Sequence, residues 1–312
     1  MATHLLIATL ALVAFLAGLH YMRKGLEGMM AGRIHLWIDR LVHSPTRGIL
    51  SGTIATGFLQ SSSAVTAIAV GLVSSDSMTF RSALGLVLGA NVGSTIAPQL
   101  LRFNLSLLAI PAMSLSIIGL VSRQQKWRAP AVACAGLATI VLALAELDHA
   151  LAPLSHEPFF LGLLTHGTGN LLMAMGCGAL ASAVIQSSTA TTLVTMSLAN
   201  DHLLTVQGAV AIVLGANIGT CLTSVIAAIG QNKGAQQVAL SHVLLNGLGV
   251  ALALPFIPVF AHAMSGTTLL PAAIVANAHT LFNLLCTLLV WPFVSQYAHF
   301  VEWLLPNRET TS

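Results

Sequence analysis

Long stretches of this chain contain no Lys, Arg, Asp or Glu. They cover residues 48–75, 82–101, 129–145, 158–200, 202–232 and 234–301. A helix needs about 20 predominantly apolar residues to cross a bilayer, and several of these stretches are long enough. They lack the period-two alternation of apolar and polar residues that a transmembrane barrel requires. The pattern therefore predicts an all-α polytopic membrane protein.

Polar residues recur inside these apolar stretches in two clusters with a constant spacing. Gln60-Ser61-Ser62-Ser63-Ala64 returns as Gln186-Ser187-Ser188-Thr189-Ala190, and Gly89-Ala90-Asn91-Val92-Gly93-Ser94 returns as Gly215-Ala216-Asn217-Ile218-Gly219-Thr220. Both pairs are 126 residues apart. Polar groups are costly inside a membrane, and matching Gly-interrupted segments in two halves are typical of a transporter's binding site. The duplication therefore predicts a functional site built from two related units.

The duplication extends to the flanking spans. Residues 4–22 correspond to 130–148, and 105–122 correspond to 231–248. We expect unit one at 1–125, unit two at 126–262, and a final transmembrane helix with a short tail at 263–312. Each unit is expected to hold a span, a connector, a re-entrant Gln-Ser-Ser hairpin, a Gly-Ala-Asn span and a third span. Residues 4–22 are interpreted as a span and not as a signal peptide, because the basic residues follow the apolar stretch.

Three crossings in each unit would turn the second unit upside down, so the basic residues can test the orientation. The connector of unit one carries Arg23, Lys24, Arg33, Arg40 and Arg47, whereas 149–173 carries no Lys or Arg. Basic loops favour the cytoplasm. We therefore expect seven spans and two inverted-topology repeats, with the N-terminus outside and the C-terminus cytoplasmic; Arg102 is the exception to this pattern. Residues 23–47 and 123–128 are expected to be cytoplasmic, and 149–158 and 262–268 external.

Residues 26–43 have apolar residues at helical spacing and place Arg33 and Arg40 on the other face. This segment is either an amphipathic helix at the membrane surface or a helix packed on the protein's own spans.

Composition narrows the function class. The chain has 312 residues, of which 56% are hydrophobic and 7% charged. Its net charge of +3 reflects topology signals and gives no indication of nucleic-acid binding. The four cysteines are far apart and show no transition-metal spacing. No base accompanies the serine clusters and the acidic residues lie at the edges of the spans, so we do not expect an enzyme.

The two motifs suggest complementary ion chemistry. Gly57 permits a chain reversal before Gln60, and a helix that starts at the serines would direct free N–H groups inward, which suits an anion. Gly89, Asn91 and Gly93 suggest a second break, whose carbonyl and amide oxygens could hold an alkali cation. The competing interpretation is that these small residues only allow close helix packing. Neither motif contains a Lys or Arg that could neutralise an anion. Burying an isolated ion is very costly, so a transported anion should arrive with its own cations.

The duplicated Gln-Ser-Ser-Ser and Gly-Ala-Asn-Ile-Gly-Thr motifs resemble the sodium–phosphate cotransporter family, which includes the animal type II transporters. Phe15-Leu16-Ala17-Gly18-Leu19, Gly25-Leu26-Glu27-Gly28-Met29 and Ala278-His279-Thr280-Leu281-Phe282-Asn283 also look like bacterial members. The resemblance implies re-entrant Gln-Ser-Ser regions that form the substrate pathway. It implies substrate ligands at Gln60, Ser61, Ser62, Ser63, Thr66, Gln186, Ser187, Ser188, Thr189 and Thr192. It implies sodium ligands at Gln60, Ser63, Asn91, Ser94, Gln186, Thr189, Asn217 and Thr220.

The chain departs from the family pattern in three places. We expect no soluble domain after the core, although many bacterial members carry one, and Thr189 replaces the third serine of the second motif. Pro98-Gln99 stands in place of the hydroxyl-rich continuation Thr223-Ser224, so the two sites are not expected to be equivalent.

We expect a secondary active transporter that couples sodium to inorganic phosphate uptake by alternating access in the cell inner membrane. Sodium is expected as the coupling ion, with no other cofactor. Phosphate, sodium and the lipid bilayer are the expected partners, and a homodimer is a candidate assembly. One alternative is a phosphate exporter or a carrier of another oxyanion on the same architecture. An alternative of another class is a non-transporting membrane scaffold or phosphate sensor.

Two further polar pairs lie on apolar segments, His242 with Asn246 and His279 with Asn283. Both are interpreted as structural pairs; a pH-sensing role is the alternative.

Overall fold

A computed structural model describes residues 2–30, 44–101, 106–122, 124–151, 169–266 and 270–306. Within these ranges the regular structure is entirely helical, which confirms the expected class. The first part of the chain forms α1 (Ala2–Met30), α3 (Pro45–Leu59), α4 (Ser62–Ser74), α5 (Phe80–Gly93), α6 (Ile96–Leu101) and α7 (Ser106–Val121). The second part forms α8 (Arg128–Leu151), α10 (Leu171–Ile185), α11 (Ser188–Asn200), α12 (Val206–Gly219), α13 (Cys221–Ala228), α14 (Lys233–Ala253), α15 (Ile257–Ser265), α16 (Pro271–Val290) and α17 (Val294–Leu304). Short 3-10 turns at Gln125–Trp127, Leu254–Phe256 and Trp291–Phe293 lead into α8, α15 and α17.

Six helical stretches in the described ranges are long and apolar enough to cross a membrane: Leu6–Leu26, Phe80–Leu101, Gln125–Ala143, Val206–Ala228, Lys233–Ala263 and Pro271–Leu304. The chain is therefore a multi-pass membrane protein. The seventh expected span, 105–122, falls on α7, which has 16 residues. The first span is longer than expected, because α1 continues through Lys24 to Met30. Residues 31–43 of the expected amphipathic helix and 152–158 of the first loop expected outside lie beyond the described residues, whereas 262–265 of the second belong to α15.

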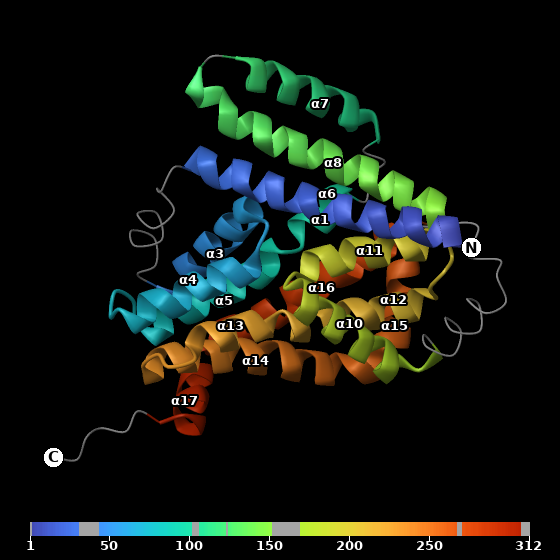
Figure 1. Ribbon diagram of the computed structural model, residues 1–312. Helices are drawn as coiled ribbons and strands as arrows, with labels where there is room; N and C mark the ends of the chain where they lie inside the picture. Colours follow the sequence, from blue (N-terminus) through green and yellow to red (C-terminus); the bar gives the residue numbers. More distant parts are fainter. Residues whose placement is uncertain are drawn as a thin grey trace.

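Helices α1 and α8 pack along each other in opposite directions, with glycines at the contact. A Cβ atom added to Gly25 would lie 2.2 Å from the amide nitrogen of Ala133, and one added to Gly18 would lie 2.9 Å from that of Ile140. Such contacts need residues without side chains, because they bring two backbones together. Helix α7 lies along the other side of α8 (Figure 1).

The interior holds two similar groups of helices. Helix α3 packs on α5 and α4 on α5 in one group, while α10 packs on α12 and α11 on α12 in the other. Helix α14 contacts α4, α5, α12 and α13. Helix α16 contacts α11, α12, α5 and α6, which are the same four elements with the two groups exchanged (Figure 1). By packing, α16 occupies the position that corresponds to α14, although the sequence alignment had assigned 105–122 to that position.

Candidate functional site

The two Gln-Ser-Ser segments are helix breaks with nearly the same backbone. Gln60 ends α3 in the left-handed region at φ 51° and ψ 31°, and Gln186 ends α10 at φ 56° and ψ 32°. Each following serine is extended, with φ −152° at Ser61 and −154° at Ser187. Each helix thus ends at a glutamine, and Gly57, which was expected to permit a chain reversal, lies inside α3. A non-glycine residue in this region costs about 1–2 kcal/mol, so the surrounding structure must stabilise both breaks.

The first serine of each motif caps the helix that follows. Ser61 Oγ accepts a hydrogen bond of 3.2 Å from the Ala64 amide, and Ser187 Oγ accepts one of 3.2 Å from the Ala190 amide. A capping hydroxyl satisfies one of the N–H groups that a helix leaves unpaired at its start. Helices α4 and α11 therefore both begin in the protein interior, where their remaining N–H groups form the positive ends of the two helices.

The glutamine side chains differ between the breaks. Gln60 is buried and its Nε2 donates to the Gly57 carbonyl, whereas Gln186 is exposed. The next residues are buried in both motifs, namely Ser62 and Ser63 in the first and Ser188 and Thr189 in the second.

Each Gln-Ser-Ser segment contacts the end of the Gly-Ala-Asn helix in the other group. Ser63 Oγ and Thr220 Oγ1 are 2.8 Å apart, and Thr189 Oγ1 donates to the Ser94 carbonyl at 3.3 Å. Adding 126 turns Ser63 into Thr189 and Ser94 into Thr220, so the two contacts join equivalent residues with the units exchanged, one between two hydroxyls and the other from a hydroxyl to a backbone carbonyl. Four of the residues expected to bind ions are thereby brought together in two crossed pairs.

The Gly-Ala-Asn segments do not break their helices at the asparagine. Helix α5 is continuous through Asn91 to Gly93, and α12 through Asn217 to Gly219, so the expected break at Gly89 to Gly93 is wrong. The glycines instead allow close packing. A Cβ atom on Gly89 would lie 2.0 Å from the Ile49 carbonyl oxygen, and one on Gly215 would lie 1.9 Å from that of Met175. The helices end at the last residue of each motif, Ser94 and Thr220, which are their C-caps.

The two asparagines are buried but have different partners. Asn91 Nδ2 donates to Asn246 Oδ1 on α14 at 2.9 Å. Asn217 Nδ2 donates to the Val213 carbonyl of its own helix at 3.0 Å. The expected sodium ligands Asn91 and Asn217 are therefore not in equivalent surroundings.

Four hydroxyls around the breaks are fully buried and have no hydrogen-bond partner: those of Thr56, Thr66, Ser182 and Thr192. They form two pairs at the 126-residue spacing, Thr56 with Ser182 and Thr66 with Thr192. Thr66 and Thr192 were expected as ligands. Thr56 and Ser182 were missed, although the same spacing that revealed the motifs would have found them four residues before each glutamine.

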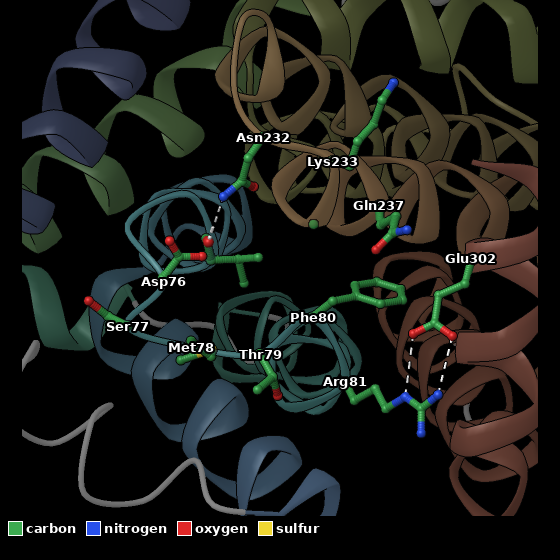
Figure 2. A pocket seen from close by; sticks show the side chains of 12 residues that line it. Asp76, Ser77, Met78, Thr79, Phe80, Arg81, Asn232, Lys233, Gln237 and Glu302 are labelled. Atoms are coloured by element: carbon green, nitrogen blue, oxygen red, sulfur yellow. Dashed lines mark hydrogen bonds and ion pairs between the residues drawn. The ribbon is translucent and has the colours of Figure 1, made fainter. Parts of the chain in front are cut away.

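A polar cavity of about 700 Å³ lies at one end of the helices. It is formed by the turn between α4 and α5, the start of α14 and the end of α17 (Figure 2). Arg81 pairs with Glu302 at 3.2 Å on its rim, and Asn232 joins the start of α14 to the last carbonyls of α4 at 3.1 and 3.2 Å. Lys233 and Asp76 also line it. The cavity thus presents both signs of charge beside the helices that lead to the first break.

Comparison with known proteins identifies the family to which this chain belongs. The sequence profile of the Na+/Pi-cotransporter family matches residues 14–149 and 156–275. The chain belongs to the Na+/Pi-cotransporter family. The match covers both Gln-Ser-Ser segments and both Gly-Ala-Asn segments, which confirms the family suggested by these motifs.

Individual members are similar over different lengths. "Uncharacterized protein YqeW" of Bacillus subtilis is 31% identical over 80% of this chain and 81% of its own length. "Putative inorganic phosphate export protein YjbB" of Escherichia coli is 30% identical over 87% of this chain, which spans only 50% of that relative. Human "Sodium-dependent phosphate transport protein 2B" is 35% identical over 92 residues, which are 28% of this chain and 13% of the human protein. No solved structure matches the chain.

Proposed function

We propose that this chain is a secondary active transporter that couples sodium to inorganic phosphate movement by alternating access. The observation that carries the proposal is the pair of crossed contacts, Ser63 with Thr220 and Thr189 with Ser94. They join the two motifs that characterise the chain at two helix starts in its interior. The sequence-expected ligand sets at Gln60–Ser63 and Gln186–Thr189 are proposed to bind phosphate and sodium there.

The proposed architecture is two inverted repeats with re-entrant hairpins. Two observations support it. The equivalent helices α1 and α8 run in opposite directions, which is the relation that inverted units would have. Helices α14 and α16 contact the same elements with the units exchanged. A binding site at the interface of such repeats is common among transporters. The proposed orientation keeps the N-terminus outside and the C-terminus cytoplasmic in the cell inner membrane.

Charge supports sodium coupling. The stretches 48–75 and 158–200, which contain both Gln-Ser-Ser motifs, carry no charged residue. A hydrogen bond to a charged group contributes about 1.5–3 kcal/mol, whereas burying an isolated ion costs tens of kcal/mol. Hydroxyls and helix ends therefore do not suffice for a phosphate anion alone. A cation that binds beside it would supply the missing charge.

Outward movement is the second candidate, since the YjbB relatives are named as putative phosphate exporters. The same site serves both directions, because the gradients determine which way an alternating-access carrier runs. A scaffold would leave the two buried helix starts without a ligand to bind, whereas a phosphate sensor would bind phosphate there without moving it across the membrane.

The test is radiolabelled phosphate uptake into proteoliposomes with and without a sodium gradient. We expect uptake that follows the gradient and falls about tenfold or more in Ser63→Ala and Thr189→Val, since each loses a bond near a desolvated ion. Ser114→Ala is the control, because its exposed hydroxyl bonds only the Ile110 carbonyl of its own helix, at 2.9 Å. Sodium-independent uptake would refute the coupling, and absence of uptake would favour the scaffold or sensor.

A further inference from the structure

Several described Ser and Thr hydroxyls on these helices bond to a carbonyl one turn earlier. Ser51 Oγ donates to the Arg47 carbonyl at 2.7 Å on α3, and Thr195 Oγ1 donates to the Thr191 carbonyl at 2.7 Å on α11. This local bond satisfies a hydroxyl that has no water nearby. Thr56, Thr66, Ser182 and Thr192 lack it, although each is fully buried.

An unsatisfied buried hydroxyl is costly, and native structures contain few of them. Here the four occur at equivalent positions of both units, on the helices that flank the two breaks. A chance packing defect at Thr56 and Thr66 would not recur at the equivalent positions, Ser182 and Thr192, 126 residues further along the chain. Buried hydroxyls without an internal partner on both sides of a helix break are groups that a bound ion could engage.

The two pairs lie at opposite helix ends. Thr56 and Ser182 are in the last turns of α3 and α10, and their carbonyls accept from the amides of Gln60 and Gln186. A helix C-terminus carries partial negative charge and favours a cation. Thr56 also faces the Gly-Ala-Asn helix, since a Cβ on Gly93 would lie 2.7 Å from the Thr56 Cβ.

Thr66 and Thr192 lie just beyond the first turns of α4 and α11, which begin at Ser62 and Ser188. The start of a helix carries partial positive charge and free N–H groups, and favours an anion. A neutral hydroxyl can coordinate a cation through its oxygen lone pairs, or donate a hydrogen bond to an anion. The helix end beside it therefore decides which ion it suits.

We propose that each break has a cation side and an anion side. Thr56 and Ser182 bind the coupling sodium ions, and Thr66 and Thr192 bind phosphate. This assignment rests on the proposed function and divides its site between the two ions. It places opposite charges on adjacent sides of each break, so each ion raises the affinity for the other.

The test measures two half-saturation concentrations in proteoliposomes. One is that of sodium at saturating phosphate, and the other that of phosphate at saturating sodium. Thr56→Val and Ser182→Ala should raise the first by roughly tenfold and leave the second near its original value. Thr66→Val and Thr192→Val should do the reverse. Thr56→Ser, which keeps the hydroxyl, should restore the sodium value.

Ser51→Ala and Thr195→Val are the matched controls, because their hydroxyls bond within their own helices. Equal shifts in controls and test variants, or the same parameter shifted by all four test variants, would overturn the assignment. A thermal melt separates these results from misfolding. If the unaltered chain shows no sodium-dependent uptake, the proposed function fails on its own. Calorimetric titration of the purified chain with sodium chloride and with sodium phosphate then tests the hydroxyls, and unchanged affinities in folded variants would refute their role.

Discussion

Helices α14 and α16 carry the same His-x-x-x-Asn spacing and pack on exchanged sets of helices, yet their polar side chains are satisfied differently. On α14, His242 Nδ1 lies 3.0 Å from Ser224 Oγ, and Asn246 Oδ1 accepts from Asn91 at 2.9 Å. On α16, both ring nitrogens of His279 and the Oδ1 of Asn283 are buried without a partner. His242 Nε2 is also buried without a partner, so the contrast lies in His242 Nδ1 and Asn246 Oδ1, which are hydrogen-bonded, whereas the corresponding atoms of His279 and Asn283 are not.

The difference has an identifiable origin in the sequence. Pro98 occupies the position that corresponds to Ser224, so α6 has no hydroxyl to offer His279. Asn217 bonds within its own helix and leaves Asn283 without the amide that Asn91 gives Asn246. Helix α16 is held elsewhere, by Gln99 Nε2 to Thr280 Oγ1 at 2.7 Å and by Thr287 Oγ1 to the Leu88 carbonyl at 3.2 Å. We therefore expect α14 to gain stability from its polar network and α16 to lose stability from its unpaired groups.

Replacing the two asparagines should give the largest contrast. Asn246→Leu leaves the Asn91 amide buried without an acceptor and should lower the free energy of unfolding by about 1–3 kcal/mol. Asn283→Leu removes an unpartnered oxygen and should be close to neutral. Thermal unfolding of the purified protein in detergent measures both. Equal losses would show that the two networks are equivalent in solution.

Replacing Pro98 with serine should give the buried His279 ring a hydrogen-bond partner. Pro98→Ser offers His279 the hydroxyl that Ser224 gives His242, and should stabilise the protein by about 0.5–1.5 kcal/mol. The same substitution in a His279→Leu background should not do so. A double-mutant cycle on the unfolding free energy isolates this term. A gain of the same size without His279 would trace the effect to the backbone.

The two glutamines should respond unequally to glycine. Glycine adopts the left-handed conformation without a steric penalty, so Gln186→Gly should stabilise by about 1 kcal/mol. Gln60→Gly gains the same relief but loses the bond to the Gly57 carbonyl, worth about 0.5–1.5 kcal/mol, and should be nearly neutral. Chemical denaturation of both variants measures the difference, and a larger gain for Gln60→Gly would contradict it.

The smallest effect is expected at the rim of the polar cavity. Arg81 joins α5 to Glu302 on α17, but the two side chains are 50% and 33% exposed. Such a pair is worth about 0–1 kcal/mol. Arg81→Gln should cost no more than that, and the loss should vanish in concentrated salt because salt screens exposed charges. A larger loss that persists in salt would mean that the pair is effectively buried.

The sequence predicted the helical class, the positions of both motifs and the family, because the polar clusters repeat at one spacing inside apolar stretches. It placed a possible chain reversal at Gly57, since no local signal in the sequence marks a left-handed glutamine such as Gln60 or Gln186. It also interpreted Gly89 to Gly93 as a helix break, although Gly89 is a close-packing position. Glycine occurs both at helix breaks and at close contacts between helices, and only the position of the neighbouring helix distinguishes the two roles.

Tertiary contacts could not be predicted in the same way. The spacing of 126 residues matched 105–122 with 231–248, yet α7 lies along α8 and α16 takes the position that corresponds to α14. A repeat in the sequence gives residue equivalence, but packing depends on which faces meet. The spacing pairs Thr56 with Ser182, but it does not reveal that their hydroxyls lack partners, because a threonine on an apolar helix usually bonds its own backbone.

The glycine contacts have a mechanical consequence. Where α3 meets α5 and α10 meets α12, backbone touches backbone, so neither helix can slide along its partner without first separating from it. Each of these helix pairs should move as one rigid unit. The two groups meet through the hydroxyl contacts at Ser63 and Thr189, and through the packing of α4 on α13 and of α11 on α6. Any large motion of this molecule should therefore rotate these rigid helix pairs relative to each other, with the hinge outside the motif-bearing helices.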